Sequence, residues 1–323
     1  MSLIEKAVKR LDQLRRASGE APPPPTTPPA ARPPAREKAA RASTSTIATG
    51  GGFKPVAPGE FKPQPASPVI VSRQVHIDLS RLAALGLVTP DQPRSRIAEE
   101  FRVIKRPLLR NAQEQGPMAI RNGNLIMVTS ALPGEGKSFS SINLAVSMAM
   151  ELDYRVLLVD ADVSKPSVLP RLGLSNERGL MDVLSGKVDN LSDVLLRTNI
   201  EKLTILPAGM REQRATELLA SESMNRLVNQ IATRYPDRLV IFDSPPLLVT
   251  TEARVLAMYM GQVVVIVEAG KTTHSDVKHA LATIENCPVK LMVLNKARDR
   301  AGRYDYGMYD DVDNNTSSEA AAN

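Results

Sequence analysis

LIMVTSALPGEGKSFSS, residues 125–141, carries the strongest structural signal in this chain of 323 residues. Its first four residues form an apolar run typical of a buried strand, a loop of small and turn-forming residues follows, and a helical pattern begins near Lys137. The sequence therefore predicts a strand, a phosphate-binding loop and a helix in direct succession.

The loop fits the Walker A pattern with one departure, since Ala131 occupies the position of the first glycine. Gly134 and Gly136 permit a tight turn that aims successive N–H groups inward, where the helix N-terminus adds partial positive charge. We expect Lys137 to reach the β- and γ-phosphates of ATP and the Ser138 hydroxyl to ligate Mg²⁺. The alternative is a glycine turn with a surface lysine. The predicted ATP-binding residues of the loop are Pro133, Gly134, Glu135, Gly136, Lys137, Ser138 and Phe139.

Apolar runs and helical patterns alternate through the rest of this region. We expect strands at residues 125–129, 155–159, 203–206, 239–242, 263–267 and 291–294, and helices at residues 137–152, 180–185, 224–235, 252–258 and 275–285. Because the strands are continuously apolar, helices should cover both faces of the sheet. The predicted fold class is therefore α/β, with a mostly parallel sheet.

Carboxylates follow two of these strands. Asp160 and Asp162 come at the end of one strand, and Asp243 follows another in the sequence Asp-Ser-Pro-Pro. Ligands of parallel sheets bind beyond the carboxyl ends of the strands, so these groups should lie beside the phosphate loop. Three acidic groups next to a triphosphate predict Mg²⁺, which takes oxygen ligands. The alternative for each Asp is a helix cap or turn residue.

Three elements are expected before the phosphate loop: a strand at 69–71, a helix at 79–85 ended by Gly86, and a longer helix at 94–115. Pro107 lies inside the last pattern, where we expect it to kink the helix or to start a new segment. The charges of this helix are typical of a salt-bridged solvent face. They belong to Glu99, Glu100, Arg102, Lys105 and Arg106.

The composition predicts one domain joined to a long tether. Thirteen of the 25 prolines fall between Pro22 and Pro68, in a segment too poor in apolar residues to offset the entropy of ordering. We therefore divide the chain into an amphipathic N-terminal helix (1–18), a disordered proline-rich linker (19–68), a nucleotide-binding domain (69–298) and a flexible tail (299–323).

The net charge of +6 is unevenly distributed, because residues 1–110 carry 19 Lys and Arg against 9 Asp and Glu. A basic arm of this kind suits nucleic acid, an anionic membrane surface or an acidic partner. Its charges are not interleaved with aromatic residues, so we expect no nucleic-acid partner. Cys287 is the one cysteine and excludes an internal disulfide, and no apolar run approaches the roughly 18 residues of a membrane span. These features predict a cytoplasmic protein.

The combination of ALPGEGKS (131–138), VLLVDADVSKPS (156–167) and VIFDSPP (240–246) resembles the bacterial tyrosine kinases over about residues 95–310. The resemblance implies a P-loop ATPase fold of the MinD type that uses ATP and Mg²⁺. It also implies phosphorylation of tyrosines in the chain's own C-terminal tail, between the subunits of a ring. MinD and ParA ATPases have a signature lysine at the position of Leu132.

Two further features resemble the same family. Glu99, Arg102 and Lys105 are similar to its E-x-x-R-x-x-R oligomerisation helix, with lysine in place of the last arginine. The tail sequence RYDYGMYDD contains half of the chain's six tyrosines, and the resemblance implies that they are the phosphate acceptors. They are Tyr304, Tyr306 and Tyr309.

The resemblance also implies roles for the carboxylates. Ser138, Asp243 and one of Asp160 or Asp162 would hold the metal, and the other Asp would accept the tyrosine proton. We assign Asp162 to the metal and Asp160 to the proton. Asn295, at the end of the last strand, is a candidate adenine contact, with a strand-end cap as the alternative.

The N-terminal helix, the proline-rich arm and the segment EEFRVIKRPLL resemble the branch of the family found with exosortase and exopolysaccharide genes. This resemblance implies a cytoplasmic kinase, recruited to the inner face of the membrane by the cytoplasmic segment of a membrane chain-length or polymerisation protein. Two alternatives stay open. One is a MinD- or ParA-like ATPase switch without kinase activity, and the other is an adaptor that tethers polysaccharide proteins.

Overall fold

The computed structural model describes residues 73–234 and 237–297. The expected N-terminal helix, the linker, the strand at 69–71 and the tail tyrosines Tyr304, Tyr306 and Tyr309 lie outside these residues. Within them, no helix combines the length and apolar character needed to cross a membrane.

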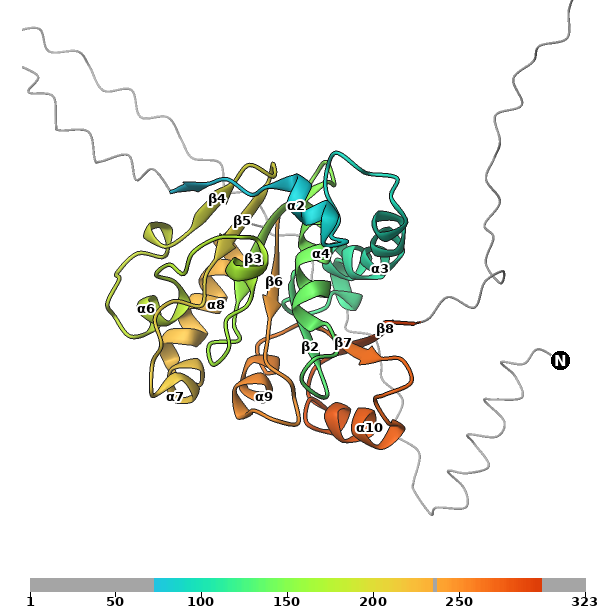
Figure 1. Cartoon of the computed structure of the whole chain (residues 1–323). Coiled ribbons are helices and arrows are strands. Elements are labelled where there is room, and N and C mark those ends of the chain that lie inside the picture. Colours follow the sequence, from blue (N-terminus) through green and yellow to red (C-terminus); the bar gives the residue numbers. More distant parts are fainter. Residues whose placement is uncertain (1–72, 235–236, 298–323) are drawn as a thin grey trace, which may run out of the picture. The chain divides into compact units, whose positions relative to one another are not determined.

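A single mostly parallel sheet organises the described residues (Figure 1). Its spatial order is β1-β4-β5-β3-β6-β2-β7-β8, and only the β4–β5 pair is antiparallel. The strands are β1 (Gln74–Val75), β2 (Leu125–Ser130), β3 (Arg155–Asp160), β4 (Leu196–Thr198), β5 (Leu203–Leu206), β6 (Arg238–Asp243), β7 (Gln262–Glu268) and β8 (Val289–Asn295).

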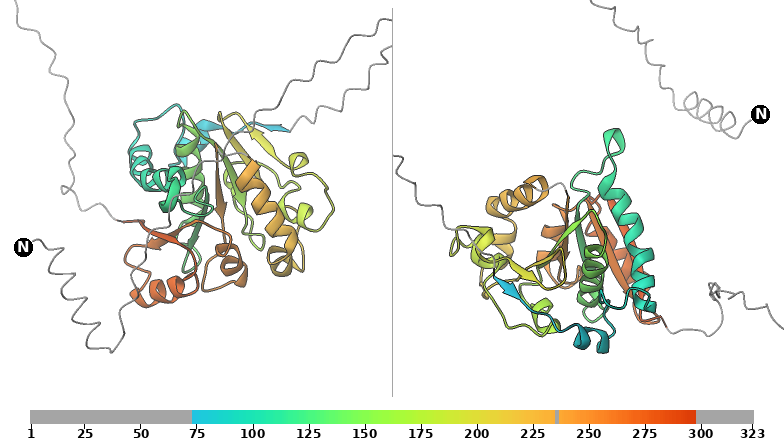
Figure 2. Two further views of the ribbon diagram at one scale, coloured as in Figure 1. Left: turned by 180° about the vertical axis from the view of Figure 1, so that it is seen from behind. Right: turned by 90° about the horizontal axis from the view of Figure 1, so that it is seen from above.

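Helices cover both faces of this sheet (Figure 2). One face carries α2 (Leu79–Ala84), α3 (Arg96–Gln113), α4 (Lys137–Ala149) and α5 (Val168–Arg171). The other face carries α6 (Leu180–Leu184), α7 (Ala215–Leu219), α8 (Glu222–Arg234), α9 (Thr251–Ala257) and α10 (His274–Ala282). Two short 3₁₀ turns span Gly116–Met118 and Leu191–Asp193.

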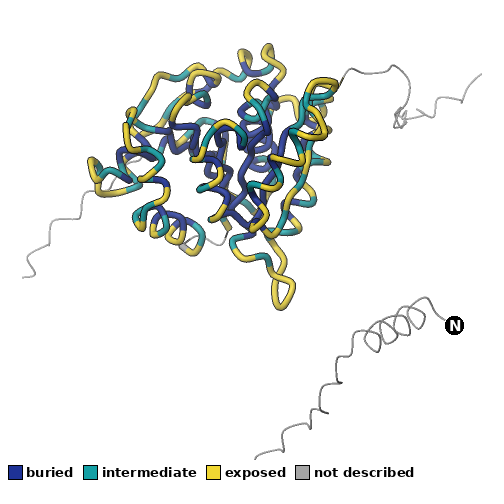
Figure 3. The backbone as a smooth tube through the Cα atoms, turned by 90° about the horizontal axis from the view of Figure 1, so that it is seen from below, coloured by how far each residue is buried: buried dark blue, intermediate teal, exposed yellow. Residues whose placement is uncertain are grey.

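The central strands are apolar throughout because each face of the sheet has its own core. In β2, Leu125 and Met127 belong to the core under α6–α10, whereas Ile126 and Val128 belong to the core under α2–α5. All six residues of β2 are buried, and Figure 3 shows the buried backbone concentrated at the centre of the fold. The continuous apolar runs of the sequence therefore arise, as predicted, because helices cover both faces of the sheet. The expectation of an α/β fold is confirmed.

The predicted elements between residues 125 and 295 are all present, with ends that differ by a few residues. The strands β1 and β4 were not predicted, and they have only two and three residues. The expectation that Pro107 would start a new segment is wrong, because Pro107 lies inside α3, which runs without a break over 18 residues. Proline removes the N–H that would bond to the carbonyl of Val103, and that residue is 74% exposed, so water can solvate the carbonyl.

The prediction that the charged residues of α3 form a solvent face is wrong for Lys105. Its side chain is buried, and its ammonium group donates to the Ser147 carbonyl at 2.6 Å and pairs with Glu151 Oε1 at 2.6 Å. Both partners lie at the C-terminal end of α4, where backbone carbonyls lack helical partners and attract a cation. Lys105 therefore fastens α3 to α4 inside the chain and is not presented to a neighbouring subunit.

Replacing Lys105 with Met keeps the aliphatic length but removes the ammonium group. We expect the free energy of unfolding to fall by about 1–3 kcal/mol, because the Ser147 carbonyl and Glu151 lose their donor. Urea denaturation of the full chain measures this change. The matched control is Arg106→Met, which removes an exposed cation from the neighbouring position and should cost less than about 0.5 kcal/mol. Equal losses in the two variants would contradict the burial argument.

Candidate phosphoryl-transfer site

The phosphate loop joins the end of β2 to the start of α4. Gly134 and Gly136 adopt φ angles of +87° and +99°, in the region that favours glycine, and Gly136 is the N-cap of α4. A Cβ atom on Gly136 would stand 2.1 Å from Nδ2 of Asn295. The loop therefore needs glycine at 136 both for its backbone conformation and for the close approach of Asn295.

Lys137 is the first residue of α4, and its side chain reaches the segment that follows β3. Its Nζ atom lies 3.0 Å from Oδ2 of Asp162, and both side chains are largely buried. The other oxygen of Asp162 accepts the N–H of Lys165 at 3.1 Å. The lysine is therefore held by a carboxylate at the position where the sequence predicts a phosphate.

Asp160 and Asp243 are the last residues of β3 and β6, and the parallel register pairs them directly. Oδ2 of Asp160 accepts the N–H groups of Ser167 and Val168, each at 3.0 Å. Oδ1 of Asp243 lies 2.9 Å from the Ser141 hydroxyl. The remaining oxygen of each carboxylate is buried and has no hydrogen-bond partner within the described residues.

Burial raises the affinity of both carboxyl groups for protons. Burial, and then the neighbouring Asp243, raises the pKa of Asp160 to about 7. Burial likewise raises the pKa of Asp243 to about 6, although the charge of Lys137 and the Ser138 and Ser141 hydroxyls oppose the shift. These two groups are therefore poised to exchange a proton or to accept a cation near neutral pH.

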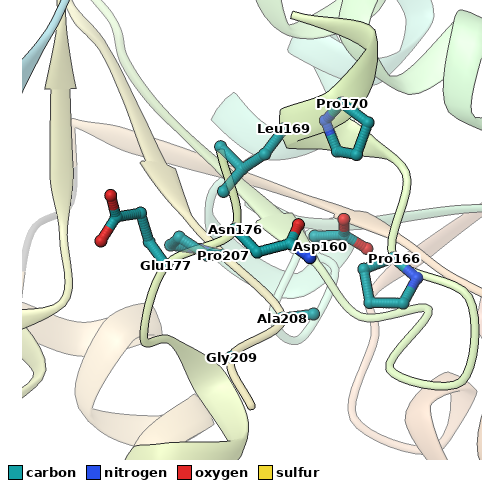
Figure 4. A pocket seen from close by; sticks show the side chains of 9 residues that line it. All are labelled: Asp160, Pro166, Leu169, Pro170, Asn176, Glu177, Pro207, Ala208 and Gly209. Carbon is teal, nitrogen blue, oxygen red and sulfur yellow. The ribbon is translucent and has the colours of Figure 1, made fainter. Parts of the chain in front are cut away.

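Asp160 also lines a small pocket (Figure 4). Prolines and aliphatic groups make up most of its wall, which explains the poor solvation of the Asp160 carboxylate. The lining residues besides Asp160 are Pro166, Leu169, Pro170, Asn176, Glu177, Pro207, Ala208 and Gly209.

Hydroxyl groups that the sequence analysis did not single out complete the site. Ser141 lies one helical turn after Lys137, and its Oγ is 2.9 Å from both Asp243 Oδ1 and the Lys137 carbonyl, so it can donate to one of them at a time. Ser167 donates to the buried Ser138 hydroxyl at 2.7 Å. The i, i+4 spacing of Lys137 and Ser141 could have identified the first of these.

Phe139 and Asn295, the other predicted nucleotide-binding residues, differ in their surroundings. Phe139 packs against the core under α2–α5, and its contact with ATP stays a prediction. The Asn295 amide donates to the Glu135 carbonyl at 2.8 Å, and its oxygen accepts the N–H of Lys296 at 2.9 Å. Asn295 thus supports the phosphate loop in this structure, and its contact with adenine stays a prediction.

The carboxylates do not form a metal site by themselves. Within the part of the chain that the structure describes, no group of three His, Cys, Asp or Glu side chains is arranged to hold a metal ion. The donor set nevertheless suits Mg²⁺, because a buried carboxylate oxygen on Asp243 lacks a partner beside the Ser138 and Ser141 hydroxyls. Mg²⁺ usually binds one or two carboxylates and completes its shell with phosphate oxygens and water.

Comparison with known proteins identifies the family to which this chain belongs. A family model described as an AAA domain matches residues 123–295, more than half of the chain. Tyrosine-protein kinase YwqD of Bacillus subtilis is 31% identical over 230 residues, which cover 71% of this chain and 93% of that protein. The chain belongs to the bacterial tyrosine-protein kinase family. That assignment agrees with the resemblance found in the sequence motifs.

Two solved structures show the same fold as this kinase. The chimerical protein CapA2B2 superposes with a TM-score of 0.58 at 30% identity, covering 71% of this chain and 95% of that one. The kinase domain of Escherichia coli tyrosine kinase ETK superposes with a TM-score of 0.57 at 28% identity, covering 68% of this kinase and 86% of that domain. The expectation of a P-loop fold is therefore confirmed.

The raised pKa of Asp160 predicts a pH dependence of stability in the metal-free kinase. Its folded-state pKa of about 7 exceeds the ordinary value of 3.8, so the folded chain binds a proton more tightly than the unfolded chain. The contribution of this proton to the free energy of unfolding is fully present below the ordinary pKa of Asp160 and is lost as pH rises through its folded-state pKa. We expect a loss of about 3 kcal/mol between pH 5 and pH 8, which Asp160→Asn should remove.

Urea denaturation of the full chain with chelator, at several pH values, measures the slope. Asp91→Asn replaces an exposed carboxyl and is the matched control, which should keep the slope of the unmodified kinase. If Asp160→Asn kept the same slope, the buried carboxyl pair would not be its source.

Proposed function

We propose that this kinase transfers the γ-phosphoryl group of ATP to tyrosines in the tail of a neighbouring copy. The acceptors would be Tyr304, Tyr306 and Tyr309, in trans. The observation that carries the proposal is the convergence of Lys137, Asp160, Asp162 and Asp243 beside the phosphate loop, from the start of α4, the end of β3 and the segment after it, and the end of β6. Phosphoryl transfer asks a protein mainly for positioning and charge neutralisation, which such a site supplies.

In the proposed reaction, ATP exchanges partners with the ion pair of the free site. Lys137 would leave Asp162 and bind the β- and γ-phosphates, which frees the Asp162 carboxylate. Ser138, Asp162 and Asp243 would then hold Mg²⁺ together with phosphate oxygens. The bound ion would neutralise charge on the transferring group. In this proposal Lys137 and Asp162 bind each other in the free site, and in the ATP-bound site they bind phosphate and Mg²⁺ respectively.

Asp160 is the proposed general base. A base is most effective when its pKa lies near the working pH, and the pKa of Asp160 is raised to about 7. Oδ2 is fixed by the N–H groups of Ser167 and Val168, and Oδ1 is without a partner within the described residues. The unpartnered oxygen would accept the proton of the tyrosine hydroxyl.

Subunit contacts of the proposed ring would involve the exposed face of α3. Glu99 and Arg102 pair with each other there, and Arg102 also donates to the Pro93 carbonyl at 3.0 Å. Lys105 is excluded from this surface by its burial. The proposed oligomer therefore uses two of the three residues that resemble the family motif.

We also propose a role in exopolysaccharide production. The partner would be the cytoplasmic segment of a membrane chain-length or polymerisation protein, which would bring the kinase to the inner face of the membrane. This part of the proposal rests on the resemblance of the sequence to the exopolysaccharide-associated branch and on the basic balance of residues 1–110.

A mixed-subunit experiment tests transfer in trans. Lys137→Met leaves the tail intact but removes the phosphate-binding ammonium group, and we expect its own transfer to fall by on the order of 100-fold or more. The triple variant Tyr304→Phe, Tyr306→Phe, Tyr309→Phe keeps the site but has no acceptors. Incubating the two with MgATP should place phosphate on the tail of the Lys137→Met chains, as read by mass spectrometry with one variant isotopically labelled.

The two variants incubated separately serve as controls. Phosphate on the tail of the Lys137→Met chains alone would argue against catalysis by this site. ATP turnover without phosphotyrosine in the unmodified kinase, also with a membrane partner segment added, would favour an ATPase switch instead.

Native mass spectrometry tests the α3 surface. We expect Glu99→Ala with Arg102→Ala to reduce the oligomer to smaller species, because the exposed charges that would meet a neighbour are removed. Lys187→Ala breaks another exposed ion pair, with Glu212, and is the control that should leave the oligomer intact. An oligomer unchanged by the double variant would rule out this face as the contact.

A further inference from the structure

Glu135 is an acidic residue in the middle of the phosphate loop and is 1% exposed. A carboxylate facing the loop's interior would repel a phosphate, so its orientation needs an explanation. One carboxylate oxygen, Oε2, accepts the N–H of Leu132 at 2.6 Å, within the loop. The other oxygen, Oε1, accepts the hydroxyl of Thr272, which belongs to a different part of the chain.

Thr272 belongs to the turn that follows β7. Its hydroxyl oxygen accepts the N–H of Glu268 at 3.1 Å while its proton goes to Glu135, and its own N–H bonds to the Glu268 carbonyl at 3.1 Å. The turn over residues 268–272 is therefore closed on itself, and it meets the phosphate loop at Oε1 of Glu135, which accepts the Thr272 hydroxyl and, at 3.5 Å, the N–H of Glu268.

A second set of contacts comes from the end of β8. The Asn295 amide donates to the Glu135 carbonyl, and the Lys296 ammonium group donates to the Gly134 carbonyl, each at 2.8 Å. Lys296 also pairs with Oε1 of Glu268 at 3.2 Å. The segments after β7 and β8 thus meet the phosphate loop in one network, in which Glu135 is the buried member.

The strand order indicates on which side of a nucleotide this network would lie. The phosphate loop follows β2, and the carboxylates Asp160 and Asp243 follow β3 and β6 on one side of it. The segments after β7 and β8 lie on the opposite side. A nucleotide whose γ-phosphate faces the carboxylates therefore extends its nucleoside toward β7 and β8, beyond the carboxyl ends of the strands.

We propose that Glu135 is a positioning residue that clamps the turn 268–272 to the phosphate loop through Thr272, so that this turn forms the nucleoside-side wall of the site. The inference rests on the proposed function in taking ATP as the ligand. Loss of the Thr272 hydroxyl leaves the Leu132–Glu135 contact intact, so the phosphate loop keeps its shape, while the wall keeps only the longer Glu268–Glu135 contact and the exposed Lys296 bridge and is loosened. Recognition of the nucleoside is then weakened separately from recognition of the phosphates.

Binding of two magnesium-loaded probes by the full chain separates these effects: ATP, and inorganic tripolyphosphate, which has no nucleoside. For Thr272→Val we expect the Kd of ATP to rise roughly tenfold by calorimetry, while the Kd of tripolyphosphate stays within about twofold. Thr283→Val is the matched control, because that hydroxyl donates to the Ala280 carbonyl at 2.7 Å near the end of α10, away from the loop. It should bind both probes like the unmodified kinase.

Thr272→Ser restores a hydroxyl and should return ATP binding to within about threefold of the unmodified kinase, whereas a purely structural defect would not follow the hydroxyl. An equal loss for ATP and tripolyphosphate in Thr272→Val, or a loss for neither, would overturn the clamp. An unmodified chain that binds neither probe would overturn the proposed function itself, and the inference with it.

Discussion

The parallel register of β3 and β6 brings two carboxylates, Asp160 and Asp243, to the same buried sheet edge, and the rest of the site accommodates that charge. Two backbone N–H groups of the α5 entry hold Asp160, and hydroxyls from α4 surround Asp243. Their pKa values are still raised, to about 7 and about 6, so the protein alone leaves the pair incompletely neutralised. A site in this condition favours a ligand that brings its own cation, as MgATP does.

Sequence reasoning succeeded where burial on both faces imposed an unbroken apolar run. Each of the six strands expected from such runs is present. Five of them, β2, β3, β5, β6 and β7, are mostly buried, where polar side chains are costly. The sixth, β8, is an edge strand whose residues alternate between half-buried and exposed. β1 and β4 have only two and three residues, too short to carry any periodicity. The carboxyl-end rule for parallel strands also predicted that Asp160, Asp162 and Asp243 lie together beside the phosphate loop, as they do.

Lys105 shows where that reasoning failed. Ala98, Phe101, Lys105 and Leu108 follow one another at spacings of three and four, so the helical pattern put the lysine on the buried stripe of α3. Its charge led to the opposite interpretation, since lysine is rarely buried without a partner. Its partners, Ser147 and Glu151, are more than 40 positions away in the sequence, so no local sequence pattern predicts them. The same holds for Thr272, which contacts Glu135 across 137 positions.

The position of Lys105 gives α3 a physical route to the phosphate loop. Helix α4 begins at Lys137 and, about 20 Å farther along its axis, ends beside the carbonyl that Lys105 binds. A helix of this length behaves as one rigid element, so a displacement of α3 at Lys105 moves the same body that carries Lys137 and Ser141. In the proposed ring, a neighbour that contacts Glu99 and Arg102 would therefore push on the element that sets the phosphate-binding lysine. Subunit assembly and nucleotide binding would then be coupled through this shared helix.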